Sequence, residues 1–216
     1  MGEIPVTIPA EGGRIPLEGR YFRGTAPHSV VICHPHPLYG GSMDNNVVLA
    51  GQKAFAEAGW STLRFNFRGV GRSGGEPGGG EHEVEDLLAA SALAKESDPA
   101  ALLHLAGYSF GAWIGVRGLA QGIGPASVHL FSPPLDFISF EGLALPAKPV
   151  LITAGSEDDF CAVQSVRDWI SGQSAVEPLV TLEIFPFCDH FYGEYEGVLA
   201  QKISAFLRKH FPPDAP

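Results

Sequence analysis

The amino-acid sequence predicts an α/β protein with a mostly parallel central sheet and helices on both faces. Short runs rich in Val, Ile, Leu and Phe recur along the chain, and each run is apolar on both of its faces. Strands of a parallel sheet have this composition because helices cover them on both sides. Segments with helical periodicity separate the runs, and a regular alternation of strand and helix is typical of the α/β class.

The beginning of the chain departs from this rhythm and predicts an antiparallel hairpin. Residues 4–8 and 15–23 have β-rich patterns, and Glu11-Gly12-Gly13 between them supplies a turn. The buried strands are then expected at residues 29–33, 60–67, 101–106, 126–131, 149–154 and 179–185. The predicted sheet is therefore parallel except for its N-terminal hairpin.

Helices are expected between these strands and after the last one. The first begins at Asn45 or Asn46, whose side chains can cap a helix, and ends at about Ala58. The second has acidic residues in its first turn, where they interact favourably with the helix dipole. This second helix is expected over about residues 82–96. Three more helices are expected, one from about Phe110, one from near Val163 and one over about 194–210.

The bulk properties predict one domain without covalent or metal staples. The chain has 216 residues, with no internal repeat and no linker, so a single domain over residues 1–216 is expected. Its proline-rich end, about 212–216, is expected to be a frayed tail. The three cysteines follow no metal or redox spacing, which favours reduced thiols. No secretory signal or apolar run of ~20 residues is evident, so a cytoplasmic protein is expected.

One short motif carries the most specific chemical signal. The segment Gly107-Tyr108-Ser109-Phe110-Gly111 follows an apolar strand and leads directly into a helical pattern. In that context Gly-x-Ser-x-Gly forms a tight turn that exposes the serine hydroxyl, and the small residues let strand and helix approach. Glycine and serine are common in ordinary turns as well, but the position between strand and helix favours Ser109 as a nucleophile.

A serine nucleophile needs a neighbouring base that is oriented by a carboxylate, and after such a motif the acid precedes the histidine. Three histidines follow Ser109 in the sequence. His129 lies within an apolar strand, and His210 lies at the end of the last helix, where its charge suits the helix dipole. His190 lies in a loop after a strand, where a base belongs in an open α/β sheet, and is the expected base.

The acid is expected in the loop that follows the next-to-last strand. Three consecutive carboxylates occur there, and such a cluster can also be a solvated turn. Their position before His190 favours a catalytic role for one of them, with Asp158 preferred, then Asp159, then Glu157. Asp189 adjoins His190, but neighbouring side chains in a loop tend to diverge, so it ranks below the others.

These residues together resemble the α/β-hydrolase superfamily over nearly the whole chain. The resemblance rests on Gly107–Gly111 as a nucleophile elbow, Gly155-x-x-Asp158 as an acid turn, Asp189-His190 as a histidine loop, and Asn66–Ser73 as an Arg-Gly-x-Gly-x-Ser stretch. The segment His34-Pro35-His36-Pro37-Leu38-Tyr39-Gly40-Gly41 resembles a subgroup of small bacterial hydrolases with largely unassigned substrates. The resemblance implies an α/β-hydrolase fold and a hydrolytic site, and it says less about the substrate.

Two details refine what the resemblance implies. Many relatives insert a helical cap between the strands at 126–131 and 149–154, whereas this chain has room there only for a loop and a short turn. No cap domain and an open site are therefore expected. Position 109 holds serine rather than aspartate or cysteine, which indicates cleavage of an ester, thioester or amide through an acyl-enzyme.

The oxyanion hole of this fold uses two backbone N–H groups. One belongs to the residue after the nucleophile, here Phe110, and the other comes from the loop after an early strand. Pro35 and Pro37 have no N–H and cannot donate. Leu38 or Tyr39 is therefore the expected second donor, with Leu38 favoured.

Two other patterns suggest ligands, and neither is sufficient. His34 and His36 have a spacing found in metal sites, but no further cluster of ligand residues accompanies them, so hydrogen bonds that shape the loop are expected and no metal. The glycines of residues 69–80 lack the following lysine of a phosphate-binding loop, which favours a surface loop.

The sequence thus predicts a serine hydrolase that cleaves small carboxylic esters without a cofactor. A thioesterase or peptidase on the same triad is one alternative, and a noncatalytic binding protein on a hydrolase scaffold is another. The net charge of −10 argues against nucleic acid and anionic membranes as partners, and the oligomeric state is left open. Residues expected to line an apolar acyl pocket, or else to belong to the core, are Tyr39, Trp113, Leu135, Phe137, Phe160 and Phe191.

Overall fold

The computed structural model describes residues 2–173 and 179–212. Its strands are β1 (Ile4–Ala10), β2 (Ile15–Phe22), β3 (His28–Cys33), β4 (Ser61–Phe65), β5 (Leu102–Tyr108), β6 (Val128–Phe131), β7 (Val150–Gly155) and β8 (Val180–Phe185). Its helices are α1 (Asn46–Glu57), α2 (Glu81–Ser97), α3 (Phe110–Ala120), α4 (Val163–Ser171) and α5 (Glu196–His210), with 3₁₀ turns η1 (Glu11–Gly13) and η2 (Pro37–Tyr39). Strand and helix alternate from β3 onwards except between β6 and β7, largely as the apolar runs predict.

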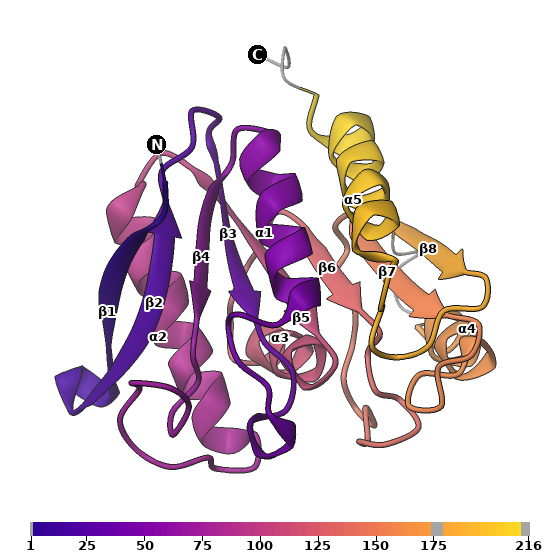
Figure 1. Ribbon diagram of the computed structural model, residues 1–216, viewed down its shortest axis with the longest axis horizontal. Coiled ribbons are helices and arrows are strands. Elements are labelled where there is room, and N and C mark those ends of the chain that lie inside the picture. Colours follow the sequence, from indigo (N-terminus) through magenta and orange to yellow (C-terminus); the bar gives the residue numbers. More distant parts are fainter. Residues whose placement is uncertain (1, 174–178, 213–216) are drawn as a thin grey trace.

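The described strands form one sheet in the order β1-β2-β4-β3-β5-β6-β7-β8 (Figure 1). β1 and β2 form the predicted antiparallel hairpin, and β2 also runs antiparallel to β4. All pairings from β4 to β8 are parallel. The carboxyl ends of β5, β7 and β8, which precede the predicted nucleophile, acid and base, therefore lie along one edge of the sheet (Figure 1).

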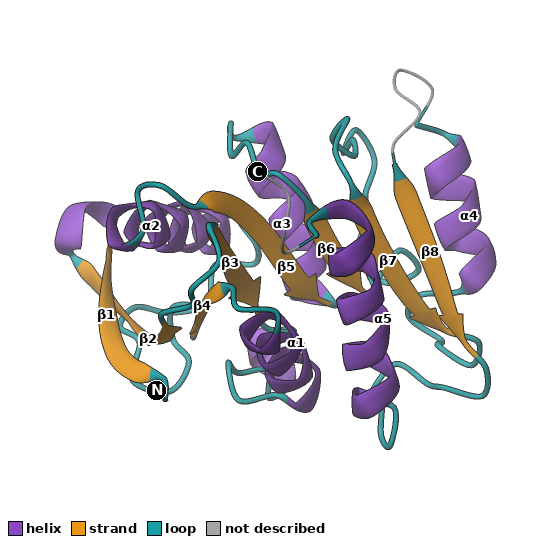
Figure 2. Cartoon of the chain, turned by 90° about the horizontal axis from the view of Figure 1, so that it is seen from above, coloured by secondary structure: helices purple, strands orange, loops and turns teal. Residues whose placement is uncertain are grey.

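Helices cover both faces of the sheet, as predicted. Figure 2 shows α1 and α5 on one face and α2 and α3 on the other. The first pair packs against the sheet through Val47, Phe55, Leu199 and Phe206, which share one buried cluster. On the opposite face, Leu87 of α2 and Ile114 of α3 belong to a second cluster. Burying both faces explains why the parallel strands are apolar throughout rather than alternating.

The differences from the predicted bounds are small and have local causes. The strand expected at 60–67 ends at Phe65, because the N–H of Phe67 donates to the Nε2 of His34 instead of a strand partner. Of the two candidate caps for α1, Asn45 is the one used, since its side-chain oxygen accepts the N–H of Val47. Of the tail expected at 212–216, all but Pro212 lies outside the described residues.

The segment between β6 and β7 forms turns, and no helical cap is inserted there in the part of the chain that the structure describes. This confirms the expectation of a fold without a lid. Within residues 2–173 and 179–212, no helix combines the length and apolar character needed to cross a membrane.

Candidate active site

Ser109 lies on the sharp turn between β5 and α3. Its backbone has a φ of 53° and a ψ of −118°, a conformation that costs a non-glycine residue about 1–3 kcal/mol. A Cβ on Gly107 would overlap the carbonyl of Gly111, and a Cβ on Gly111 would overlap the carbonyl of Cys33. The two glycines of the motif are therefore needed for the close approach of β5, α3 and the end of β3. This turn holds the Ser109 hydroxyl above the edge of the sheet.

The structure brings Ser109, His190 and Asp158 into one hydrogen-bonded chain. The Nε2 of His190 lies 2.9 Å from the Oγ of Ser109. Its Nδ1 lies 2.9 Å from each carboxylate oxygen of Asp158. All three side chains are largely buried, with residue exposures of 9%, 7% and 4% for serine, histidine and aspartate. The arrangement can pass the serine proton to the imidazole while the carboxylate stabilises the imidazolium.

Asp158 is the acid that the structure places against His190, and the alternatives point elsewhere. Its Oδ1 also accepts the backbone N–H groups of Phe160 and Cys161, at 2.9 Å each. Glu157 and Asp159 are exposed, and the Oδ1 of Asp189 accepts the N–H of Phe191 at 2.9 Å.

The contacts of Asp158 keep this carboxyl ionised. Burial alone would raise its pKa, but hydrogen bonding and electrostatic attraction from His190 outweigh that effect. Further hydrogen bonds from Ser132 and from the N–H of Phe160 act in the same direction, so the pKa of Asp158 lies below its usual value.

The prediction that Leu38 or Tyr39 supplies the second oxyanion donor is corrected by the structure, because both N–H groups already have acceptors. The N–H of Leu38 donates to the Nδ1 of its neighbour His36 at 3.2 Å, and the N–H of Tyr39 donates to the His36 carbonyl at 3.1 Å. Both N–H groups therefore form hydrogen bonds within the 3₁₀ turn η2 and are not free to bind an oxyanion. Sequence reasoning excluded the two prolines correctly but overlooked the residue between them.

His36 is the candidate second oxyanion donor that the sequence-based prediction missed. Within the described residues its backbone N–H has no hydrogen-bond acceptor, and neither has that of Phe110. Both residues line the same cleft as Ser109, and their rings pack together with centroids 4.6 Å apart. The pattern Pro-x-Pro was the available signal, since proline on each side leaves a single N–H in the turn.

His34 and His36 form loop-shaping hydrogen bonds, as expected. The Nε2 of His34 accepts the N–H of Phe67 at 3.0 Å, so its Nδ1 carries the proton and donates to the Pro35 carbonyl at 2.6 Å. Burial lowers the pKa of His34 to about 4, which keeps the ring neutral. These contacts attach the start of the loop to the end of β4.

The cleft above Ser109 has a volume of about 450 Å³ and is mainly aromatic. Of the six side chains expected there or in the core, four line it: Tyr39, Phe137, Phe160 and Phe191. Pro134, Ile138 and Tyr108 also line it and were not predicted. Among the described residues that form its walls there is no Asp, Glu, Lys or Arg.

Trp113 and Leu135 do not line the cleft, and this corrects their assignment as pocket residues. The indole N–H of Trp113 donates to the carbonyl of Ser139 at 3.0 Å, and the Arg117 guanidinium lies 4.7 Å from its ring centroid. Leu135 packs against the buried cluster of β6, β7, α3 and α4. Both residues take the alternative role, structural packing.

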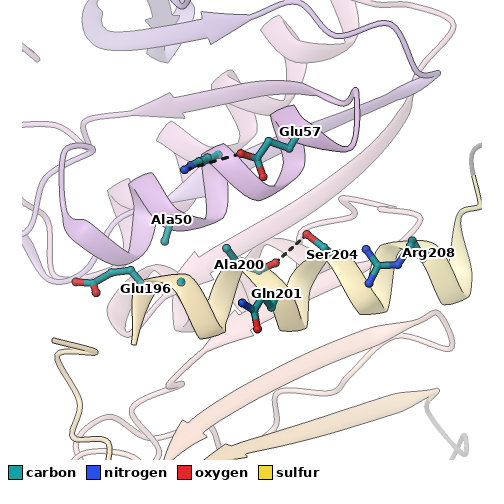
Figure 3. Close-up of a pocket in the computed structure, with 9 residues that line it drawn as sticks. Ala50, Glu57, Glu196, Ala200, Gln201, Ser204 and Arg208 are labelled. Carbon is teal, nitrogen blue, oxygen red and sulfur yellow. Dashed lines mark hydrogen bonds and ion pairs between the residues drawn. The ribbon is translucent and has the colours of Figure 1, made fainter. Parts of the chain in front are cut away.

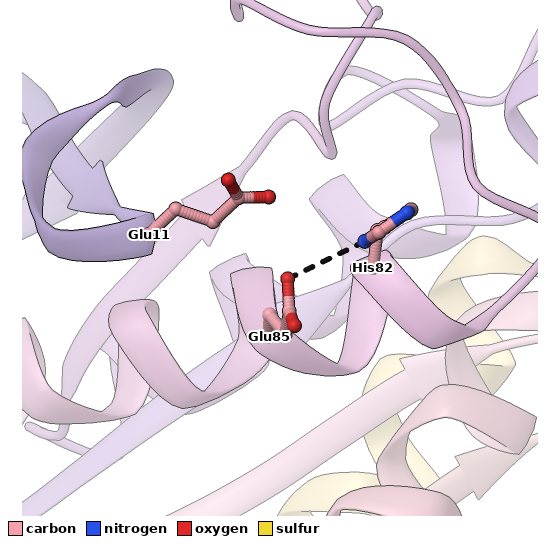
Figure 4. Close-up of side chains that lie close together, drawn as sticks. All are labelled: Glu11, His82 and Glu85. Atoms are coloured by element: carbon pink, nitrogen blue, oxygen red, sulfur yellow. Dashed lines mark hydrogen bonds and ion pairs between the residues drawn. The ribbon is translucent and has the colours of Figure 1, made fainter.

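Two further features lack the chemistry of the Ser109 cleft. A groove between α1 and α5, of about 450 Å³, is lined by small and charged side chains of both helices (Figure 3). Glu11, His82 and Glu85 lie close together as potential metal ligands (Figure 4). The Arg68 guanidinium contacts Glu11 at 2.6 Å and Glu85 at 3.4 Å, so this protein cation already neutralises the carboxylates.

Comparison with known proteins identifies relatives along the whole fold. No family model matches the chain. An uncharacterized protein of Rickettsia prowazekii is 35% identical over 201 residues, which cover 88% of this chain and 84% of that protein. An α/β serine hydrolase without a lid from Xanthomonas campestris is 30% identical, with a TM-score of 0.89 over 100% of this chain and 98% of its own. An α/β serine hydrolase homologue from Coxiella burnetii is 32% identical, with a TM-score of 0.86 over 96% and 98% of the two chains.

Proposed function

Because this chain belongs to the α/β serine hydrolases, we propose that it hydrolyses small, uncharged carboxylic esters through an acyl-enzyme on Ser109. The observation that carries the proposal is the continuous chain of hydrogen bonds from Ser109 through His190 to Asp158. We also propose that the loop beginning at His34-Pro35-His36-Pro37 marks the subgroup of small bacterial hydrolases that it resembles. No cofactor takes part in this reaction.

His190 acts first as a base and then as an acid. Its Nε2 removes the proton from the Ser109 hydroxyl as the oxygen attacks the ester carbonyl carbon. Asp158 holds the imidazole in the tautomer with hydrogen on Nδ1 and stabilises the positive charge that develops. The same Nε2–H then protonates the departing alcohol oxygen. In the second half-reaction His190 activates a water molecule, which releases the acid and restores Ser109.

The oxyanion of each tetrahedral intermediate is held by the backbone N–H groups of Phe110 and His36. Phe110 begins α3, so its N–H has no acceptor within the helix and the positive end of the helix dipole lies behind it. His36 supplies the second donor from the loop after β3. Removing one such donor from a serine enzyme costs about 2.7–4 kcal/mol of transition-state stabilisation.

The cleft supports an uncharged, apolar acyl group. Its aromatic walls can bury apolar surface, which favours binding by about 25 cal/mol per Å² of apolar area removed from water. A carboxylate or ammonium group on the substrate would lose hydration there without meeting an opposite charge among the described wall residues. The absence of a lid from the described residues leaves the cleft open to water for deacylation.

Incubation with p-nitrophenyl esters of increasing acyl length, and with the matching thioesters and amides, tests the proposal. We expect turnover of the esters, an initial burst, and labelling of Ser109 by a fluorophosphonate probe. Ser109→Ala should abolish turnover and labelling while the protein remains folded. Ser29→Ala is the matched control, because the hydroxyl of Ser29 is buried without a hydrogen-bond partner in the described part of the chain. Faster cleavage of thioesters or amides, or turnover by Ser109→Ala, would contradict the proposal.

A further inference from the structure

Tyr192 lies two residues after His190, and its hydroxyl is buried near the carboxyl ends of β6 and β7. The Oη lies 3.0 Å from the Oγ of Ser132 and 2.7 Å from the Oγ1 of Thr153. Ser132 directly follows β6, and Thr153 belongs to the strand that leads to Asp158. The hydroxyl of Tyr192 thus fastens one side of the His190 loop to the strands beside the acid.

Tyr108 makes the corresponding contact on the other side of the histidine. Its hydroxyl donates to the backbone carbonyl of His190 at 2.7 Å, and the two rings lie 5.5 Å apart. Tyr108 is the last residue of β5 and directly precedes Ser109. Its side chain is only 2% exposed, so water does not compete effectively for the hydroxyl. This contact ties the backbone of His190 to the strand that carries the nucleophile.

The loop that carries His190, from Phe187 to Glu194, has a strained backbone on both sides of the histidine. Phe187, Tyr192 and Glu194 all have positive φ values, of 59°, 57° and 67°. Non-glycine residues keep such conformations only where surrounding contacts hold them. The hydroxyls of Tyr108 and Tyr192 are contacts of that kind, and they join this loop to β5, to β7 and to the residue that follows β6.

We infer that Tyr108 and Tyr192 are positioning residues, whose hydroxyls hold His190 at hydrogen-bonding distance from both Ser109 and Asp158. The inference rests on the proposed function, since it assigns their role in that reaction. Neither hydroxyl exchanges a proton with the substrate. Each fixes the backbone from which the imidazole extends, so the ring reaches the serine and the carboxylate at once.

The contacts of Tyr192 also lead towards the acid. Ser132, whose Oγ lies 3.0 Å from the Tyr192 hydroxyl, is one of the groups that lower the pKa of Asp158. Loss of the Tyr192 hydroxyl would therefore leave the Ser132 side chain without a buried partner that fixes it beside the acid.

Tyrosine-to-phenylalanine variants test the inference, because the substitution removes only the hydroxyl. For Tyr108→Phe and Tyr192→Phe we expect kcat on p-nitrophenyl butyrate to fall about 10- to 100-fold with little change in KM, the effect of a misplaced catalytic group. Tyr21→Phe is the matched control. Tyr21 is 8% exposed, and its Oη has no hydrogen-bond partner among the described residues.

A second readout does not depend on turnover. The low-field proton NMR resonance of the Nδ1–H of His190 reports its hydrogen bond to Asp158. We expect both tyrosine variants to shift or broaden this resonance, and Tyr21→Phe to leave it unchanged. The resonance tests the positioning role even if the wild-type protein cleaves none of the esters, in which case the proposed function would fail separately.

A double-mutant cycle separates positioning from simple stabilisation. In the Asp158→Ala background, Tyr192→Phe should have little further effect on kcat, because the pair through which it acts is already lost. Full additivity with Asp158→Ala would overturn the inference. So would wild-type kcat and an unchanged resonance in both tyrosine variants.

Discussion

Gly155 lies directly against the backbone of Cys188, at the point where the strand that leads to Asp158 meets the loop that carries His190. A Cβ on Gly155 would overlap the carbonyl oxygen of Cys188, and the carbonyl oxygen of Asp189 would lie 3.0 Å away. That same Cys188 oxygen accepts the N–H of Glu157 at 3.0 Å. The acid and base segments are thus in backbone contact, and the distance between their side chains depends on a missing methyl group.

Gly155→Ala adds a single methyl group, but we expect it to impair activity strongly because that methyl group would overlap the His190 loop. Relief of the overlap requires the His190 loop to move, which should lower kcat by up to about 100-fold. Overpacking should also reduce the free energy of unfolding by about 1–3 kcal/mol. Gly197→Ala is the control, since an added Cβ there meets no atom within 4 Å. In α5 it should leave kcat unchanged and raise stability by up to about 1 kcal/mol.

Asp158→Asn should abolish most of the activity without unfolding the protein. The neutral amide can stabilise the wrong tautomer of His190 and cannot balance the imidazolium charge, so a loss of about 10⁴-fold in kcat is expected. Asp159→Asn, which neutralises an exposed neighbour, should retain wild-type kinetics. Equal losses in the two variants would show that the carboxylate acts through the general field of the loop and not through His190.

The aromatic wall predicts a dependence on acyl size. Phe137 is 52% exposed at the cleft and packs against Tyr39 and Phe160, with ring centroids 6.1 and 5.6 Å away. Phe137→Ala should weaken binding of aromatic or long acyl groups by about 0.5–1.5 kcal/mol, seen as a rise in KM, and change acetate esters little. Phe187→Ala removes a ring that is 79% exposed and outside the cleft, and it should change neither series.

Buried histidines predict a loss of stability in mild acid. Burial lowers the pKa of His104 to about 2 and that of His129 to about 3, whereas histidines of the unfolded chain titrate near 6.5. Below pH 6.5 the unfolded state binds protons that the folded state excludes, so stability is full above that pH and decreases as the pH falls. The decrease is about 1.4 kcal/mol per histidine for each pH unit.

Urea unfolding between pH 7.5 and 5 measures this slope. His129→Leu should reduce it, because one of the excluded protons is no longer in competition. A slope unaffected by His129→Leu would assign the acid sensitivity to other groups.

The fold and the grouping of Ser109, Asp158 and His190 could be predicted because their signals are local or follow chain order. Apolar runs separated by helical periodicity define the parallel strands, and Gly107 to Gly111 has a backbone shape that few other residues allow. Once Ser109 is fixed, the order of acid and base leaves few candidates. Among those, Asp158 is buried and Asp159 is exposed, a difference that the sequence alone does not show.

The remaining errors concern groups whose role depends on contacts made in three dimensions. Leu38 was favoured as an oxyanion donor because the sequence cannot show that the His36 imidazole takes its N–H. Trp113 lies one turn beyond Ser109, but its indole faces Arg117 and the carbonyl of Ser139. The hydroxyl of Tyr192 reaches Ser132, 60 positions away in the sequence, and no local pattern reveals such a contact.

The order of the strands has a consequence for the timing of folding. β5, which directly precedes Ser109, pairs with β3 and β6 near the middle of the sheet, whereas His190 follows β8 at its outer edge. As the chain leaves the ribosome, Ser109 is synthesised long before the last strand can dock beside β7. The contact between Ser109 and His190 therefore cannot form until β8 and the loop after it have been added, so Ser109 stays without this partner while β3 to β7 assemble.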